Sequence, residues 1–87
     1  MADLAVGISA YTAGNYEVAA REFMESAHQG DDDAQMTLGF MYANGEGVTR
    51  DDVEAAKWFA ASAAQGNPLA QVSLGSVYAD GKGVAQD

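Results

Sequence analysis

Residues 34–51 read AQMTLGFMYANGEGVTRD and residues 70–87 read AQVSLGSVYADGKGVAQD, so ten positions are identical between two stretches that lie 36 residues apart. A second set of residues alternates with the first and recurs with the same offset. Its members are Ala19, Ala20, Phe23, Ser26, Ala27, Gln29 and Gly30, which recur as Ala55, Ala56, Phe59, Ser62, Ala63, Gln65 and Gly66. A fixed period of this length is typical of repeat architectures, in which each unit packs against the next.

Both halves of the period have the spacing of an amphipathic helix, with apolar residues on one face. The first half predicts a helix over 33–44, with an apolar face at Ala34, Leu38, Met41 and Tyr42. The second half predicts a helix over 52–65, with an apolar face at Ala55, Ala56, Phe59 and Ala63. The repeat therefore predicts a pair of helices, and a further helix begins near Pro68.

Capping residues fall at the ends of these helices. Asp51 and Glu54 have the spacing of a capping box, with Asp in the place of Ser or Thr. Asn67, which is followed by proline, has the pattern of an N-cap residue before a first helical position. Glycines stand where left-handed C-caps are expected, at Gly30 and Gly66.

Other glycines lie inside the helices and in the loop between them. Gly39 and Gly75 are mid-helix, where glycine costs about 1 kcal/mol, so we expect a neighbouring helix to approach closely there. The loop 44–48 contains two glycines that can adopt positive φ, and Val48 can pack back onto the helices. The sequence therefore predicts a tight turn with an apolar anchor.

The N-terminal unit is an imperfect copy of the repeat. Twelve residues separate Gly7 from Ala19, whereas 16 separate Gly39 from Ala55. The first loop is therefore expected to be four residues shorter, with its turn at 14–16.

The composition argues against nucleic acid and membranes as partners and against disulfide bonds as a source of stability. The 87 residues suffice for one small domain, and 13 acidic against four basic residues give a net charge of −9. Such a charge repels phosphate backbones and anionic lipids, so we expect neither nucleic acid nor a membrane as partner.

Cysteine is absent, which leaves helix packing as the source of stability. Residues 1–7 have neither a basic region nor an apolar run, so the cytoplasm is the default compartment, with the periplasm or secretion implied if a signal peptide has been removed.

The sequence resembles Sel-one-like repeats, a subclass of the tetratricopeptide-like helical repeats. The resemblance rests on A-x-x-x-L-G-x-x-Y-x-x-G-x-G-V, followed by D and then by A-x-x-W-F-x-x-S-A-x-Q-G, from Ala34 to Gly66. It implies an all-α, right-handed α-solenoid of antiparallel helix pairs, with about two and a half repeats and five helices. Residues 1–87 would form one repeat domain, in which 2–30 resembles a tetratricopeptide unit, 31–66 is a complete repeat and 67–87 is a partial third repeat.

No set of residues in the chain has the pattern of a catalytic, metal or cofactor site. His28 is the only histidine and is interpreted as a cation at a helix C-terminus. Asp31, Asp32 and Asp33 lack the alternating ligands of a calcium loop, and we interpret them as an N-terminal cap, with a cation site as the alternative. Gly45-x-Gly47 and Gly81-x-Gly83 follow helices rather than strands, which is unlike a phosphate-binding loop. We therefore expect no enzyme activity, no cofactor and no metal.

The resemblance also implies a concave face formed by the first helix of each pair. Positions three before, one after and four after the repeat glycine would point into it, and they are Leu4, Ile8, Tyr11, Met36, Phe40, Ala43, Val72, Ser76 and Ala79. Methionine and aromatic side chains are common in adaptable binding surfaces, although any of these residues could instead belong to the core. Phe40 is the most informative, because its counterpart is Ser76, and Asp33 and Asn44 could form a polar rim.

The function implied by the resemblance is a scaffold that binds a protein or peptide on its concave face and catalyses nothing. The net charge of −9 would favour a basic partner. The alternative is a structural or self-assembling part of a longer array. In that case the last helix is expected to expose Leu74 and Tyr78, and another copy or a partner would cover them.

Overall fold

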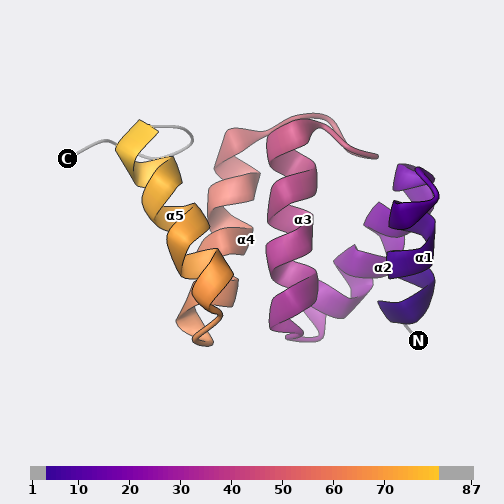
Figure 1. Cartoon of the computed structure of the whole chain (residues 1–87), viewed down its shortest axis with the longest axis horizontal. Helices are drawn as coiled ribbons and strands as arrows, with labels where there is room; N and C mark the ends of the chain where they lie inside the picture. Colours follow the sequence, from indigo (N-terminus) through magenta and orange to yellow (C-terminus); the bar gives the residue numbers. More distant parts are fainter. Residues whose placement is uncertain (1–3, 81–87) are drawn as a thin grey trace.

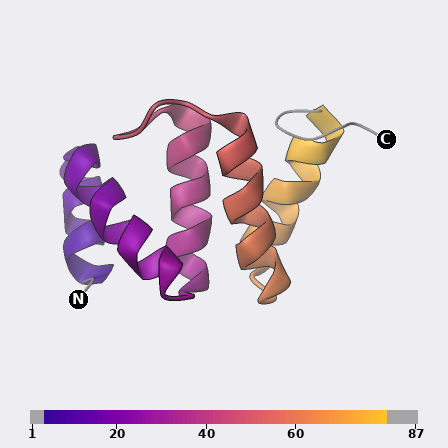
Figure 2. The same cartoon turned by 180° about the vertical axis from the view of Figure 1, so that it is seen from behind.

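The computed structural model describes residues 4–80, and the side chains of residues 4–76 within them. These residues form five helices and contain no strand: α1 (Leu4–Thr12), α2 (Tyr16–His28), α3 (Asp32–Asn44), α4 (Asp52–Ala64) and α5 (Pro68–Asp80). Each helix packs against the next along the chain, and the helices stand in a row (Figure 1), which Figure 2 shows from behind. The expected all-α helical repeat is confirmed, and it is elongated, with extents of 38 × 25 × 17 Å.

The helix ends follow the capping residues. The Asp31 carboxylate accepts a hydrogen bond from the Ala34 N–H at 2.9 Å, and the Asn67 side-chain oxygen accepts one from the Ala70 N–H at 3.0 Å. Gly30 and Gly66 have φ values of 96° and 92°, as expected for left-handed C-caps. The loop lengths also agree with the sequence, because 13–15 join α1 to α2 whereas 45–51 join α3 to α4.

The predicted capping box at α4 forms only in part. The Asp51 carboxylate accepts from the N–H groups of Val53 and Glu54 at 3.0 and 3.1 Å. The Asp51 N–H, however, donates to the Tyr42 carbonyl at 3.0 Å, so the role expected for the Glu54 side chain is taken by the end of α3.

The consecutive helices α2, α3 and α4 contribute to one core, which runs along the row. Its fully or almost fully buried members are Ala19, Ala20, Phe23, Ala27, Ala34, Leu38, Met41 and Trp58. The predicted apolar face of α3 is confirmed, because Ala34, Leu38 and Met41 have no exposed surface and Tyr42 packs against the core. In α4, Ala55, Ala56 and Phe59 are buried, and Ala63 is half-buried.

The two mid-helix glycines behave differently. A Cβ on Gly39 would lie 2.6 Å from the Phe59 ring, so the close approach expected there is confirmed. A Cβ on Gly75 would meet nothing within 4 Å, so the same expectation is wrong for α5. The residue equivalent to Phe59 in the next repeat would be 36 positions further on, beyond the 87 residues of this sequence. Glycine at position 75 is therefore not required by any described neighbour.

The loop 45–51 folds back over the start of α2. Gly47 has φ of 73°, and a Cβ there would collide with the Tyr16 carbonyl oxygen, so this position needs glycine for both conformation and space. Val48 packs against the core, as expected for the apolar anchor. The Tyr11 hydroxyl donates to the Glu46 carboxylate at 2.9 Å, which ties the loop to α1.

Candidate partner-binding surface

Two open hollows lie on either side of α3. The α1–α3 hollow has a volume of about 380 Å³ and is lined by Ile8, Tyr11, Thr12, Phe23, Thr37, Phe40 and Asn44. The α3–α5 hollow has a volume of about 370 Å³ and is lined by Phe40, Ala43, Asn44, Arg50, Asp52, Ala55, Phe59, Val72, Ser73 and Ser76. Because Phe40 and Asn44 line both, the hollows adjoin across α3.

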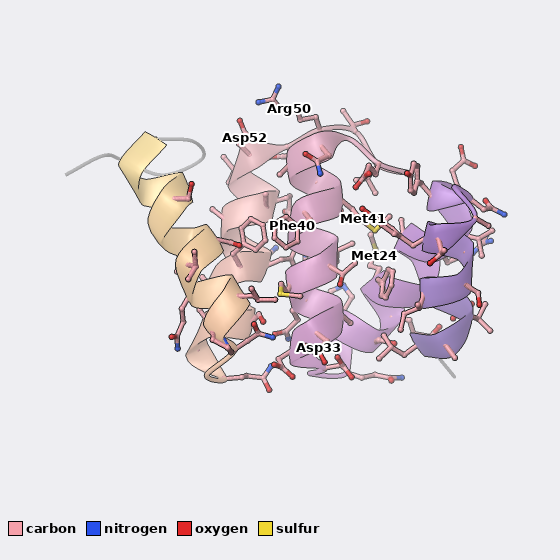
Figure 3. All side chains as sticks on the ribbon, in the orientation of Figure 1. Met24, Asp33, Phe40, Met41, Arg50 and Asp52 are labelled. Carbon is pink, nitrogen blue, oxygen red and sulfur yellow. The ribbon has the colours of Figure 1, made fainter. Side chains whose placement is uncertain are left out.

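Phe40 forms the ridge between the two hollows. Its ring packs edge-on against the Phe59 ring, with 5.0 Å between centroids and an angle of 71° between the planes. The residue is still 38% exposed, although it is a large apolar side chain. Figure 3 shows it about halfway along α3, with Arg50 and Asp52 at the end where α4 begins and Asp33 at the opposite end. Phe40 is thus held in place by the core and presented to solvent.

The structure brings most of the residues expected on the concave face into these hollows. The residues that line at least one of them are Ile8, Tyr11, Phe40, Ala43, Val72 and Ser76. Leu4 and Met36 are half-buried and line neither, and Leu4 packs against the core. The side chain of Ala79 lies outside the described residues. Of the two residues suggested for a polar rim, Asn44 lines both hollows and Asp33 lines neither.

Five further lining residues of the α3–α5 hollow were not expected from the sequence, and one of them is Ser73 on α5. Ala55 and Phe59 come from α4, the second helix of the pair, and form part of the floor. Arg50 and Asp52 come from the end of the loop and the first turn of α4. The apolar spacing of α4 predicts that both residues are buried, but it cannot show that they lie at the bottom of a hollow between α3 and α5.

The two charged residues that line the α3–α5 hollow form an ion pair. Arg50 and Asp52 approach to 3.3 Å, with side chains that are 61% and 30% exposed. Asp52 is the first residue of α4, where the helix dipole favours a negative charge. An exposed pair of this kind contributes roughly 0–1 kcal/mol, so either partner can exchange it for a ligand at little cost.

Two tyrosines, Tyr11 and Tyr42, have raised pKa values. Burial raises the pKa of Tyr11 to about 12, with further increases from its hydrogen bond to Glu46 and from the Glu46 charge. The rings of Tyr11 and Tyr16 pack with centroids 5.1 Å apart. Burial also raises the pKa of Tyr42, helped by the charges of Glu54 and Asp51. The Tyr11 hydroxyl therefore remains protonated and keeps its bond to the loop at neutral pH.

The acidic run before α3 is bonded within the protein. Asp31 caps the helix, while the Asn67 amide donates to Asp32 and Asp33 at 3.0 and 3.1 Å. The three carboxylates lie within 4.8 Å of one another. These contacts agree with the predicted capping role, and Asn67 extends that role by joining the start of α3 to the start of α5.

The histidine and the described loop glycines, which were weighed as possible catalytic or phosphate-binding residues, lie at the ends of helices and in turns. His28 is the last residue of α2, as expected, and packs edge-on against Trp58 with centroids 5.2 Å apart. Gly45 and Gly47 form the turn after α3, and Gly81-x-Gly83 lies outside the described residues. Over residues 4–80, no helix is sufficiently long and apolar to cross a membrane.

The repeat and the helix pairs agree with the comparison to known families. The model of the Sel1 repeat matches residues 32–67 and 68–87. The chain belongs to the Sel1 repeat family. Members of this family are commonly scaffolds for protein interactions and are generally non-catalytic.

Two solved structures support this assignment. One is a protective antigen present in uropathogenic Escherichia coli strains that displays an SLR fold, with 36% identity and a TM-score of 0.90 over 97% of this chain. The other is a Sel1 repeat protein from Oxalobacter formigenes, with 35% identity and a TM-score of 0.91 over 98% of this chain. The chain spans 19% and 35% of the length of these proteins, respectively. A search of curated proteins found no match.

Proposed function

We propose that this Sel1 repeat protein binds a protein or peptide segment on the surface formed by the two hollows, and that it catalyses no reaction. The observation that supports the proposal most directly is Phe40, a large apolar side chain that is 38% exposed between two adjoining hollows. Interfaces concentrate their binding energy in a few aromatic anchors beside well-formed pockets. The net charge of −9 favours a basic partner.

The repeat pattern gives independent support to this choice of surface. Phe40 corresponds to Ser76 in the next unit, so an aromatic ring is not needed at this position to form the helix. Phe59 would retain its contacts with the rest of the core if Phe40 were shortened, because it is only 2% exposed and lies beneath Gly39. Shortening Phe40 should therefore affect binding more than folding.

The test is selection from a phage-displayed library of random peptides on the immobilised protein, followed by measurement of affinity. We expect selected peptides to bind Phe40→Ala and Phe40→Ser at least about 10-fold more weakly, as for an interface hot spot. Met36→Ala tests whether the surface extends beyond the hollows. The control is Val53→Ala, since Val53 is 63% exposed and lines neither hollow. Retention of binding by both Phe40 variants would refute the proposal.

A second candidate function is self-association through α5. Leu69 and Val72 on this helix are 62% and 72% exposed, and Gly75 has no neighbour within 4 Å of a Cβ. Leu74, which we expected to be exposed, is half-buried, and the Tyr78 side chain lies outside the described residues. The segment 68–76 also contains no charged residue, so two copies could meet there without direct repulsion.

Light scattering during gel filtration tests this second candidate. We expect a mass that rises with protein concentration and a return to the monomer mass in Leu69→Glu, which places a charge on the apolar face but leaves both hollows unaltered. A constant monomer mass over the whole concentration range would exclude self-association.

A further inference from the structure

The two hollows differ in the charge of their linings. No charged residue lines the α1–α3 hollow, whereas the α3–α5 hollow has Arg50 and Asp52 at one end. The rest of the α3–α5 hollow is apolar or neutral, with two aromatic rings and three aliphatic side chains, Ala43, Ala55 and Val72. An apolar group that enters this hollow therefore has charged side chains on one side only.

The floor of the α3–α5 hollow suits an apolar side chain. Phe40 and Phe59 meet edge to face, and Val72 closes the opposite wall while remaining 72% exposed. Burial of the exposed parts of Phe40 and Val72 by a ligand would be favourable at about 25 cal/mol per Å² of apolar surface. Ser73, Ser76 and Asn44 can bond to polar atoms next to that side chain.

The charges around the rim favour a cation. Residues 50–57 contain two positive and three negative side chains, with Lys57 paired to Glu54 at 3.4 Å, and the whole chain has a net charge of −9. The Asp52 carboxylate is the less exposed member of the ion pair and sits in the first turn of α4, where the helix dipole favours a negative charge. The more exposed Arg50 lies on the loop and competes with any incoming cation for Asp52.

We infer that the α3–α5 hollow recognises an apolar side chain whose neighbour in the partner is Lys or Arg, with Asp52 as the acceptor of that cation. The inference rests on the proposed function and specifies the partner segment for one of its two hollows. The α1–α3 hollow, with its uncharged lining, takes a second apolar side chain without preference for a charged neighbour.

Three variants separate the effects of the rim charges. In Asp52→Asn, a peptide with a basic neighbour should bind about three- to fivefold more weakly, as expected for loss of a partly exposed ion pair. In Arg50→Gln, the same peptide should bind as well or better, because a competing cation has been removed. The matched control is Glu54→Gln, which removes the same charge two residues from Asp52 at a position that lines neither hollow, and its effect should stay below about twofold.

The experiment uses peptides selected on the full chain from the random phage library, each synthesised with its own sequence and with the basic residue replaced by Gln. We expect enrichment of Lys or Arg beside an apolar residue, and a preference for the basic form that Asp52→Asn abolishes and Glu54→Gln retains. Enrichment of acidic residues that depends on Arg50, or Phe40-dependent peptides without any basic preference, would overturn the inference alone. A selection that yields no Phe40-dependent peptide would overturn the proposed function as well.

Discussion

Helices α3 and α5 have closely related sequences but different surroundings. Leu38 in α3 is fully buried, while its counterpart Leu74 in α5 is half-buried. Gly39 lies against the Phe59 ring, while Gly75 has open space where a Cβ would be. The reason is the position in the row, because α3 packs between α2 and α4, whereas the main packing partner of α5 is α4 (Figure 1).

This difference distinguishes the helical conformation of a repeat, which its own sequence determines, from the burial of its side chains, which depends on neighbouring helices. The backbone of α5 is helical like that of α3, although α5 packs mainly against a single helix. The burial of equivalent side chains differs, because in a solenoid each unit is stabilised largely by the interfaces it shares with adjacent units. The same substitution, made at equivalent positions in α3 and α5, should therefore change the free energy of unfolding by different amounts.

The largest difference is expected for the leucine pair. Leu38→Ala removes a fully buried side chain and should lower the free energy of unfolding by about 2–5 kcal/mol. Leu74→Ala removes a half-buried side chain and should cost about 1 kcal/mol or less. Urea denaturation followed by circular dichroism measures both. Equal losses for the two variants would show that α5 is as well packed as α3 and would contradict the comparison.

The glycine pair should give effects of opposite sign. Gly39→Ala places a Cβ 2.6 Å from the Phe59 ring, and such overpacking costs about 1–3 kcal/mol. Gly75→Ala meets no neighbour, so the higher helix propensity of alanine should stabilise the protein by up to about 1 kcal/mol. Thermal unfolding detects both, since 1 kcal/mol shifts Tm by about 4–8 °C in a domain of this size.

A double variant identifies the cause of the loss in Gly39→Ala. Phe59→Leu replaces the ring that the new methyl group meets with a smaller side chain. The loss of unfolding free energy caused by Gly39→Ala should therefore be smaller in the Phe59→Leu background than in the wild type. Additive effects of the two substitutions would show that a change in the helix itself, rather than contact with Phe59, is responsible.

Much of the fold could be predicted from local patterns. The helix ranges, the N-caps at Asp51 and Asn67 and the shorter first loop all depend on residues close together in the chain, and the structure confirms them. The close approach at Gly39 could also be predicted, because glycine within a helix needs a packing reason. The same rule was wrong for Gly75, since the sequence pattern does not show which neighbours are present.

The surface could be predicted less completely. The resemblance to the repeat family placed Phe40 and Val72 on one face, and both line the α3–α5 hollow. Arg50 and Asp52 could not be assigned to it, because their position depends on the path of the loop 45–51. That path is set by contacts distant in sequence, such as the bond from Tyr11 to Glu46 and the fit of Gly47 against Tyr16.

A smaller difference is expected for the glutamines that join successive helix pairs. The Gln35 amide donates to the Ala27 carbonyl at 3.1 Å and is buried, and its oxygen accepts from Gln65 at 2.9 Å. The equivalent bond from Gln71 to the Ala63 carbonyl is 3.4 Å long and exposed. Gln35→Ala should therefore cost about 1 kcal/mol, and Gln71→Ala less than about 0.5 kcal/mol.

Hydrogen exchange checks the glutamine prediction at the level of single junctions. Loss of Gln35 should speed amide exchange at the end of α2 and just after α4, where its partners Ala27 and Gln65 lie, and leave α5 unchanged. Uniform acceleration throughout the protein would mean that the residue acts through global stability instead of this junction.

A similarly small effect is expected for the bond that anchors the loop after α3. Tyr11 donates to Glu46, but the corresponding residues one unit later are Ala43 and Lys82, so the sequence predicts no such anchor beside α5. Tyr11→Phe should lower the free energy of unfolding by about 0.5–1 kcal/mol near neutral pH.

The contribution of the Tyr11 hydroxyl should depend on pH, because its pKa is raised to about 12 in the folded state from about 10 in an unfolded chain. The contribution is fully present below about pH 10 and is lost as the pH rises toward 12. The wild type should thus lose its advantage over Tyr11→Phe in this alkaline range, and urea denaturation of both proteins at a series of pH values measures the change, since all other titrating groups are common to the two. A difference that stays constant up to pH 12 would show that the hydroxyl is not held by burial and Glu46 as the structure indicates.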